Sequence, residues 1–326
     1  MPVRGAEKAE KEMETSQYRM VLARWGVIAF FLTAGVSPVR ALILFNLDNN
    51  ANQTDPGTGV PWQTVGKVTN AAGTSVSGSA VYLGDGFLLT ANHVTVGAGL
   101  DHITFDGTTT YPLDQTYFAG QVSRSIGGSV DLKLLRLTSS LPFSGANLLP
   151  VGVETTGPAT AIGWGVGRNA TPLGNATVGW GGDATSAKRW GLNGPEAVVN
   201  IGYGNGTYQA IATSNGGDDG AGSAYNPDGL GDSEAALTLY DSGSGLFQNI
   251  SGNWYLIGIG TAVDVNFTSL YANDTFGVSG SGHGNYYVRV SSYYTGILAA
   301  IPEPSTSLLV VFGLAALSRL RCRSRA

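Results

Sequence analysis

The sequence is poor in cysteine and in charge, and each shortage excludes a class of protein. One cysteine among 326 residues rules out a disulfide scaffold, and a chain with 43% hydrophobic and only 13% charged residues is neither disordered nor a coiled coil. Residues 42–301 hold 8 Lys and Arg against 18 Asp and Glu, a net charge of −10. Without a basic surface, no nucleic-acid partner is expected.

Glycine is abundant, with 48 residues, and its distribution indicates a β protein. Glycine weakens helix interiors by about 1 kcal/mol, and the middle of the chain has neither a G-X-Y repeat nor sustained helical periodicity. Short apolar runs alternate with Gly, Asn, Asp and Ser turns, as in the predicted hairpins 79–90 and 246–259. The 260 residues of 42–301 suffice for one large β domain or two small barrels.

The first 41 residues are predicted to be a signal peptide. An apolar stretch within 21–35 follows basic residues, and small residues offer a cleavage site after Ala41. Translation from Met20 would give this signal an ordinary leading region. An N-terminal membrane anchor is the alternative, but the stretch is shorter than the roughly 20 residues that a span needs.

The C-terminal region 301–326 combines a Pro-Glu-Pro triplet at 302–304, an apolar run at 308–317 and four arginines beyond it. This layout resembles the PEP-CTERM sorting signal of Gram-negative bacteria. The resemblance implies transient membrane association through a membrane-sorting helix at 308–317, processing by an exosortase-type enzyme, and export to the cell envelope or the extracellular space. An amphipathic helix fits less well, because the run is apolar on every face.

Three stretches, in chain order, carry a second resemblance: 88–94 (L-L-T-A-N-H-V), 130–137 (V-D-L-K-L-L-R-L) and 241–247 (D-S-G-S-G-L-F). They resemble the T-A-x-H, D-x-A-L-L-x-L and G-D-S-G-G-P-L-x segments of chymotrypsin-like (trypsin-like) serine proteases. Further strands of that family are similar to 161–165, 254–259 and 284–294. The resemblance implies an all-β fold of two six-stranded antiparallel β-barrels, 42–145 and 146–300, with a short C-terminal helix.

The same resemblance implies a Ser-His-Asp triad, with His93 as general base, Asp131 as the residue that orients it and Ser242 as nucleophile. A serine hydroxyl is a poor nucleophile at neutral pH, so an imidazole must take its proton and a buried carboxylate must fix the imidazole tautomer. The predicted function is an exported serine endopeptidase that cleaves protein or peptide substrates through an acyl-enzyme. This chemistry needs no metal and no organic cofactor.

Several residues remain as alternatives to these assignments. The other two histidines, His102 and His283, lie in polar, loop-like stretches, where a solvated histidine is the expected role. Ser233 is followed by Glu234 where a tight turn favours glycine, and Ser244 lacks a preceding aspartate. The aspartates of the loop 214–231 could ligate calcium through their oxygens, although a solvated acidic loop is favoured.

The family's oxyanion hole uses the backbone N–H groups of the nucleophilic serine and of the residue two before it, which here are Ser242 and Tyr240. Glycine is usual at the earlier position, and another residue is strained at left-handed backbone angles. A catalytically weak or inactive protease-like surface or matrix protein is therefore the alternative function. An adhesin or lectin is a third reading, but it leaves the three ordered stretches unexplained.

The resemblance also places Ala236 at the base of the substrate side-chain pocket and Thr261, Ala262 and Val263 in its wall. A small apolar base favours uncharged substrate side chains. The chain has no stretch like I-V-G-G that could form a new N-terminus beside Asp241. The enzyme is therefore expected to fold in an active form without a proteolytic clip.

Overall fold

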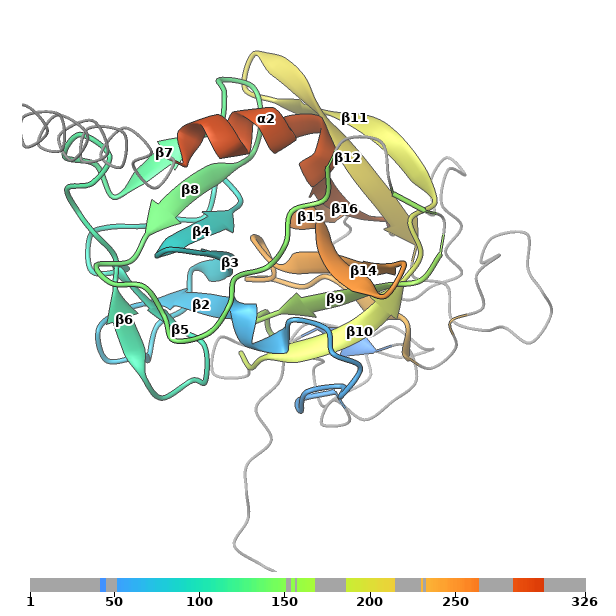
Figure 1. Ribbon diagram of the computed structural model, residues 1–326, viewed down its shortest axis with the longest axis horizontal. Helices are drawn as coiled ribbons and strands as arrows, with labels where there is room; N and C mark the ends of the chain where they lie inside the picture. The colour runs from blue at the N-terminus through green and yellow to red at the C-terminus, as the bar shows by residue number, and fades with distance from the viewer. Residues whose placement is uncertain are drawn as a thin grey trace, which may run out of the picture. The chain divides into compact units, whose positions relative to one another are not determined.

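The computed structural model describes residues 42–44, 52–150, 154–155, 157–167, 186–214, 230, 233–263 and 284–301. Within these ranges the chain forms two seven-stranded antiparallel sheets, a two-stranded pair and a C-terminal α-helix (Figure 1). This confirms the predicted all-β class, with two antiparallel half-barrels followed by one short helix. Each sheet has one strand more than the six that the sequence predicted.

The first sheet has the strand order β6-β5-β2-β3-β4-β8-β7. Its strands are β2 (Val65–Thr69), β3 (Gly78–Gly84), β4 (Phe87–Thr90), β5 (His102–Thr104), β6 (Thr110–Pro112), β7 (Ser123–Ser125) and β8 (Lys133–Arg136). A bridge between Leu113 and Leu137 joins the chain just after β6 to the chain just after β8. Six strands therefore curl into a barrel, and the three-residue β7 is added to β8 as a seventh.

The second sheet has the order β10-β9-β14-β15-β16-β12-β11. Its strands are β9 (Ala159–Gly163), β10 (Arg189–Asn193), β11 (Ala197–Tyr203), β12 (Gly206–Ser214), β14 (Gly245–Ile250), β15 (Asn253–Val263) and β16 (Gly284–Arg289). The seventh strand is β11, the outer half of a hairpin with β12. A separate pair joins β1 (Ile43–Leu44) to β13 (Ala235–Ala236).

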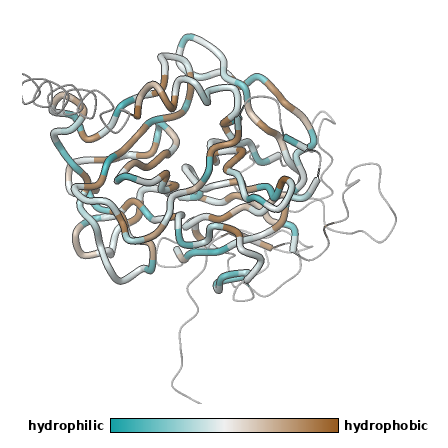
Figure 2. The backbone as a smooth tube through the Cα atoms, in the orientation of Figure 1, coloured by the Kyte–Doolittle hydropathy of each residue, from teal (hydrophilic) through white to brown (hydrophobic). Residues whose placement is uncertain are grey.

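Apolar side chains from both sheets pack into one shared cluster. It includes Val65, Leu89 and Leu134 from the first sheet and Ile162 and Phe247 from the second, all fully buried. Figure 2 shows hydrophobic stretches along the strands of both sheets, separated by hydrophilic turns. Burying each such side chain contributes about 1.5 to 3 kcal/mol. The shared cluster therefore stabilises the packing of the two barrels against each other.

The helix α2 (Val290–Ala300) follows β16 directly. Its buried Ile297 belongs to the shared cluster together with Ile126, which precedes β8 of the first sheet. The helix thus packs against side chains of both barrels. Among the described residues, no helix is both long and apolar enough to cross a membrane.

Several expectations concern residues outside the described ranges. These are the signal peptide 1–41, the sorting run 308–317, most of the acidic loop 214–231, and His283. The strands of the first sheet all precede residue 145 and those of the second all follow it. The domain limits themselves stay predictions.

Candidate active site

Strand pairing brings His93 and Asp131 to the same edge of the first barrel. His93 follows the end of β4, and Asp131 precedes the start of β8. The two strands are antiparallel, with Thr90 opposite Lys133. Residues just after one strand and just before the other must therefore lie close together, although they are 38 positions apart in the sequence.

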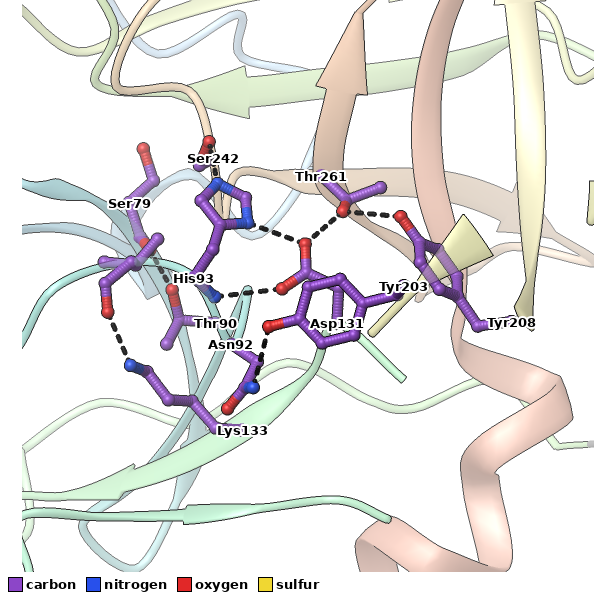
Figure 3. Close-up of polar contacts among 11 residues, drawn as sticks. Ser79, Thr90, Asn92, His93, Asp131, Lys133, Tyr203, Tyr208, Ser242 and Thr261 are labelled. Atoms are coloured by element: carbon purple, nitrogen blue, oxygen red, sulfur yellow. Dashed lines mark hydrogen bonds and ion pairs between the residues drawn. The ribbon is translucent and has the colours of Figure 1, made fainter. Parts of the chain in front are cut away.

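Asp131 contacts His93 through both carboxylate oxygens (Figure 3). Oδ1 accepts a hydrogen bond from the His93 backbone N–H at 2.9 Å, and Oδ2 lies 2.6 Å from Nδ1 of the ring. Burial of Asp131 acts to raise its pKa, but hydrogen bonds and charge from His93, with a hydrogen bond from Thr261, hold the pKa below its ordinary value. An ionised carboxylate only accepts hydrogen bonds, so Nδ1 carries the ring proton and Nε2 is free to accept one.

Behind Asp131 lies a chain of two buried hydroxyls. Thr261 of β15 donates a hydrogen bond to Oδ2 of Asp131, and the Tyr208 hydroxyl lies 2.8 Å from Thr261 Oγ1 (Figure 3). A threonine hydroxyl has a single proton, which Thr261 directs to the carboxylate, so Tyr208 must be the donor in the second bond. The second barrel therefore holds the carboxylate that the first barrel supplies.

Ser242 lies in the turn that precedes β14, in the second barrel. Its Oγ is 2.7 Å from Nε2 of His93, 149 positions earlier in the sequence. Backbone bonds fix the turn: Gly243 N–H donates to the Gly260 carbonyl at 2.7 Å, and Ser244 N–H donates to the Asp241 carbonyl at 2.8 Å. The His93 side chain is 42% exposed whereas that of Asp131 is 3% exposed. The reacting end of the triad is thus open to solvent and its carboxylate end is buried.

Tyr240, two residues before Ser242, has a φ angle of 72°. This is the left-handed conformation that glycine adopts freely and that costs another residue roughly 1 to 2 kcal/mol. The strain that the sequence predicted at this position is therefore present. The backbone at Tyr240 nevertheless adopts the left-handed conformation that glycine, the usual residue at this position, would adopt without strain.

Asp241, which stands between Tyr240 and Ser242 in the sequence, is fully buried. Its carboxylate accepts hydrogen bonds from the Gly165 N–H, the Thr238 N–H and the Thr238 hydroxyl, all at 2.8 to 2.9 Å. Burial raises the pKa of Asp241 to about 6, although these donors and the charge of Arg189 act to lower it. These groups of the second barrel therefore help to hold the nucleophile turn, residues 240–244.

The alternative residues lie elsewhere. His102 pairs with its neighbour Asp101, with Nδ1 and Oδ1 2.8 Å apart. Ser244 is fully buried, and its Oγ has no hydrogen-bond partner among the described residues. Among the described residues, Ser242 alone of the three serines is hydrogen-bonded to the imidazole of His93.

The residues expected to form the substrate pocket divide into two groups. Ala236, in β13, has no exposed surface, and Thr261 directs its hydroxyl to Asp131. Thr261 therefore supports the carboxylate, and its place in a pocket wall stays a prediction. Ala262 and Val263 are partly exposed at the end of β15, and their place in a pocket stays a prediction.

Sequence reasoning missed two residues beside the triad. Tyr208 lies in a strand with no family pattern in the sequence, and nothing local indicates its contact with Thr261. Lys133 is buried, and its Nζ donates to the carbonyl of Val94, the residue after His93, at 2.5 Å. Desolvation lowers the pKa of Lys133, and the charge of Asp131 opposes this shift. A lysine flanked by Leu132 and Leu134 in the sequence is the one signal that could have drawn attention to it.

The described residues offer no group of three His, Cys, Asp or Glu side chains that could hold a metal ion. The aspartates considered as calcium ligands, Asp218, Asp219 and Asp228, lie outside the described ranges.

Comparison with known proteins found likenesses only among solved structures. No protein-family model matches the chain, and no curated protein sequence matches it. Among solved structures it is similar to an inactive serine-to-alanine mutant of Rv3671c from M. tuberculosis H37Rv, with 12% identity, a TM-score of 0.46, and coverage of 76% of this chain and 93% of that one. A second similar structure is that of the Rv3671c protease in its inactive form, with 13% identity and a TM-score of 0.45. The match covers 76% of this chain and 97% of that one.

A third similar structure is the HtrA-type protease AlgW with a decapeptide, at 21% identity and a TM-score of 0.40, covering 67% of this chain and 50% of that one. At these identities and TM-scores, the likenesses decide nothing about activity. The functional proposal rests on the side-chain geometry of this chain.

Proposed function

We propose that the protein is an exported serine endopeptidase that uses Ser242 as nucleophile, His93 as general base and Asp131 as the residue that orients His93. The observation that carries the proposal is one continuous hydrogen-bonded line. Asp131 Oδ2 is 2.6 Å from His93 Nδ1, and His93 Nε2 is 2.7 Å from Ser242 Oγ. Both distances are within the reach that proton transfer requires.

The first half of the reaction follows from this line. The Ser242 oxygen attacks the carbonyl carbon of a peptide bond while its proton passes to Nε2 of His93. The imidazolium that forms lies against the ionised Asp131, which stabilises its charge without taking the proton. Nε2 then gives the proton to the departing amine, and the acyl group remains on Ser242.

The second half repeats these steps with water. A water molecule gives a proton to Nε2 and attacks the acyl carbon, and the proton returns to the Ser242 oxygen as the carboxylic acid departs. The open side of His93 suits this exchange of amine for water, because its side chain is 42% exposed. Each proton therefore moves through one nitrogen atom in both halves.

Negative charge develops on the carbonyl oxygen in both halves, and backbone N–H groups are its proposed partners. The Ser242 N–H donates to no acceptor among the described residues, which leaves it available to a substrate oxygen. The second donor would be the N–H of Tyr240, in the turn that φ of 72° produces. Such donors contribute about 10² to 10³ in kcat each in enzymes where one has been removed.

The rest of the proposal concerns substrates and location. A triad of this kind takes peptide bonds of proteins or peptides, and the proposal keeps the preference for uncharged side chains that the small apolar residue Ala236, the expected base of the pocket, predicts. Export through the signal peptide at 1–41, tethering through 308–317 and processing by an exosortase-type enzyme complete the proposal. None of this chemistry calls for a cofactor.

Hydrolysis by matched serine variants tests the proposal. The full chain is incubated with casein and with peptides labelled at an uncharged residue, and compared with Ser242→Ala and with Ser233→Ala as the control. We expect Ser242→Ala to lose about 10⁴-fold or more in kcat and Ser233→Ala to retain full activity. An inactive wild type that folds normally would favour the alternative of a protease-like surface or matrix protein.

A further inference from the structure

Ser79, in β3 of the first barrel, bonds the turn that carries Ser242 through its backbone N–H and its hydroxyl. It is fully buried. Its N–H donates to the Ser242 carbonyl at 2.7 Å. Its own carbonyl accepts from the Thr90 hydroxyl at 2.6 Å (Figure 3). Its hydroxyl accepts from the Trp164 N–H at 3.0 Å and donates to the Tyr240 carbonyl at 3.1 Å.

The direction of the hydroxyl bond is fixed by the surroundings. The Trp164 N–H can only donate, so the single proton of the Ser79 hydroxyl is left for the Tyr240 carbonyl, which can only accept. Trp164 follows the end of β9, a strand of the second barrel. The hydroxyl thus links two segments of the second barrel: it accepts from Trp164 and donates to Tyr240.

The turn and β3 are also in close backbone contact. A Cβ atom at Gly243 would lie 1.9 Å from the Ser79 carbonyl oxygen, and a Cβ at Gly78 would lie 2.8 Å from the Ser242 carbonyl oxygen. Only glycine fits at either point. The first barrel therefore presses against the turn, and Ser79 supplies the directional bonds within that contact.

These bonds bear on the strained residue of the turn. A non-glycine residue stays at a left-handed φ only where its surroundings hold it there. Ser79 bonds the carbonyl of Tyr240 and the carbonyl of Ser242, so it holds both ends of the segment whose N–H groups would face a substrate oxygen. No contact of this kind could be foreseen from the sequence, because Ser79 and Tyr240 are 161 positions apart.

We propose that Ser79 is a positioning residue: its hydroxyl holds Tyr240 in the left-handed conformation, so that the oxyanion-binding turn is formed before substrate arrives and without a proteolytic clip. The benefit to catalysis, a ready-made site for the substrate oxygen, rests on the proposed function. The role of Ser79 in holding Tyr240 does not, because the hydrogen bonds and the left-handed φ are present whether or not the protein cleaves a substrate.

The first test measures the turn directly. Amide hydrogen exchange, followed by mass spectrometry, compares wild type with Ser79→Ala over 238–244 and over the neighbouring strand 245–250. We expect exchange in 238–244 to become about tenfold faster, because the Tyr240 carbonyl and the buried Trp164 N–H lose the Ser79 hydroxyl, with 245–250 unchanged. Unchanged exchange in 238–244 would overturn the proposal.

The matched control is Thr69→Val, which removes another fully buried hydroxyl of the first barrel, one that donates to the Ser75 carbonyl within its own hairpin. It should leave exchange in 238–244 unchanged. If Ser79→Ala fails to fold, Ser79→Cys keeps a weaker donor of similar shape, and the same segment should still exchange faster than in wild type. Equal acceleration by Thr69→Val would show a general loss of stability and would overturn the assignment.

The second test is a double-mutant cycle with Tyr240→Gly. In active protein, Ser79→Ala should lower kcat about tenfold with KM within about twofold, because the lost contact acts on the transition-state donors. With glycine at 240 the left-handed turn carries no strain, so the same substitution should cost less. Equal losses in both backgrounds would contradict the role of Ser79. A wild type without activity, in which Ser79→Ala still loosens 238–244, would refute the proposed function and leave the positioning role intact.

Discussion

Thr261 donates a hydrogen bond to Oδ2 of Asp131, the same oxygen that faces Nδ1 of His93. One carboxylate oxygen thus joins the imidazole to the second barrel, which also supplies Ser242. The hydroxyl stabilises the ionised carboxylate, and Tyr208 keeps that hydroxyl pointing toward it. The alignment of His93 therefore depends on a residue from the opposite barrel.

Replacing Thr261 should lower the activity of the triad without abolishing it. Thr261→Val removes a donor that lowers the pKa of Asp131, so the carboxylate should protonate at a higher pH. We expect kcat to fall about tenfold and the acidic limb of the kcat/KM profile to move to higher pH, because a hydrogen bond to a charged group contributes about 1.5 to 3 kcal/mol. Thr261→Ser keeps the hydroxyl and should restore both values. A Val variant with the wild-type pH profile would contradict this role.

The buried Asp241 should make stability depend on pH. Its pKa is raised to about 6 from 3.8, so the folded chain binds a proton that the unfolded chain has lost between these values. Stability therefore falls as the pH rises through this window. Urea unfolding at pH 4, 5, 6 and 7 should show wild type losing about 2 to 3 kcal/mol relative to Asp241→Asn across that range. A difference between the two chains that does not vary with pH would refute the assignment.

Lys188 should produce the opposite slope at higher pH. Its Nζ donates to the Phe105 carbonyl at 3.2 Å and lies 4.7 Å from the Trp62 ring centroid. Burial lowers the pKa of Lys188 to about 7, opposed by the charges of Asp55 and Asp106.

The unfolded chain keeps the Lys188 proton up to a pH of about 10.5, whereas the folded chain loses it above about 7. The free energy of unfolding should therefore rise with pH above 7, by at most about 1.4 kcal/mol per pH unit. Lys188→Met keeps the apolar stem and should abolish that rise, as measured by urea unfolding between pH 7 and 9. A Met variant with the wild-type slope would show that another group causes it.

Relief of strain at Tyr240 should be measurable as stability. Tyr240→Gly removes the cost of φ at 72° and should raise the free energy of unfolding by about 0.5 to 1 kcal/mol. Ser251→Gly is the matched control, because Ser251 has a φ of 53° in the exposed turn between β14 and β15. Both substitutions should stabilise the chain, and only the one at 240 should change kcat. A destabilised Tyr240→Gly would mean that the tyrosine side chain contributes more than its backbone costs.

The sequence was sufficient for the parts of the site that local patterns record. His93, Asp131 and Ser242 each lie beside a strand of recognisable pattern, their chain order is distinctive, and histidine is too scarce to offer many rivals. The structure brings these three side chains together. The β class was predictable because strands and turns alternate clearly, whereas the two barrels and the terminal helix were predicted from the family resemblance alone.

What the sequence could not show are contacts between segments far apart in the chain. Thr261 was expected in a pocket wall, and its bond to Asp131 spans 130 positions. Ser79 reads as an ordinary strand residue until Tyr240 lies beside it. The seventh strand β7 has three residues, too few for an alternating pattern to predict.

The central claim is that the imidazole of His93 makes the Ser242 hydroxyl a strong nucleophile, and a fluorophosphonate probe tests it most directly. Such a probe forms a covalent bond with an activated serine, and intact-mass and peptide mass spectrometry locate the adduct. We expect one probe per chain, attached to Ser242, with labelling abolished in Ser242→Ala and slowed at least a thousandfold in His93→Ala. A folded wild-type chain that takes up no probe, or takes it up at another serine, would contradict the account.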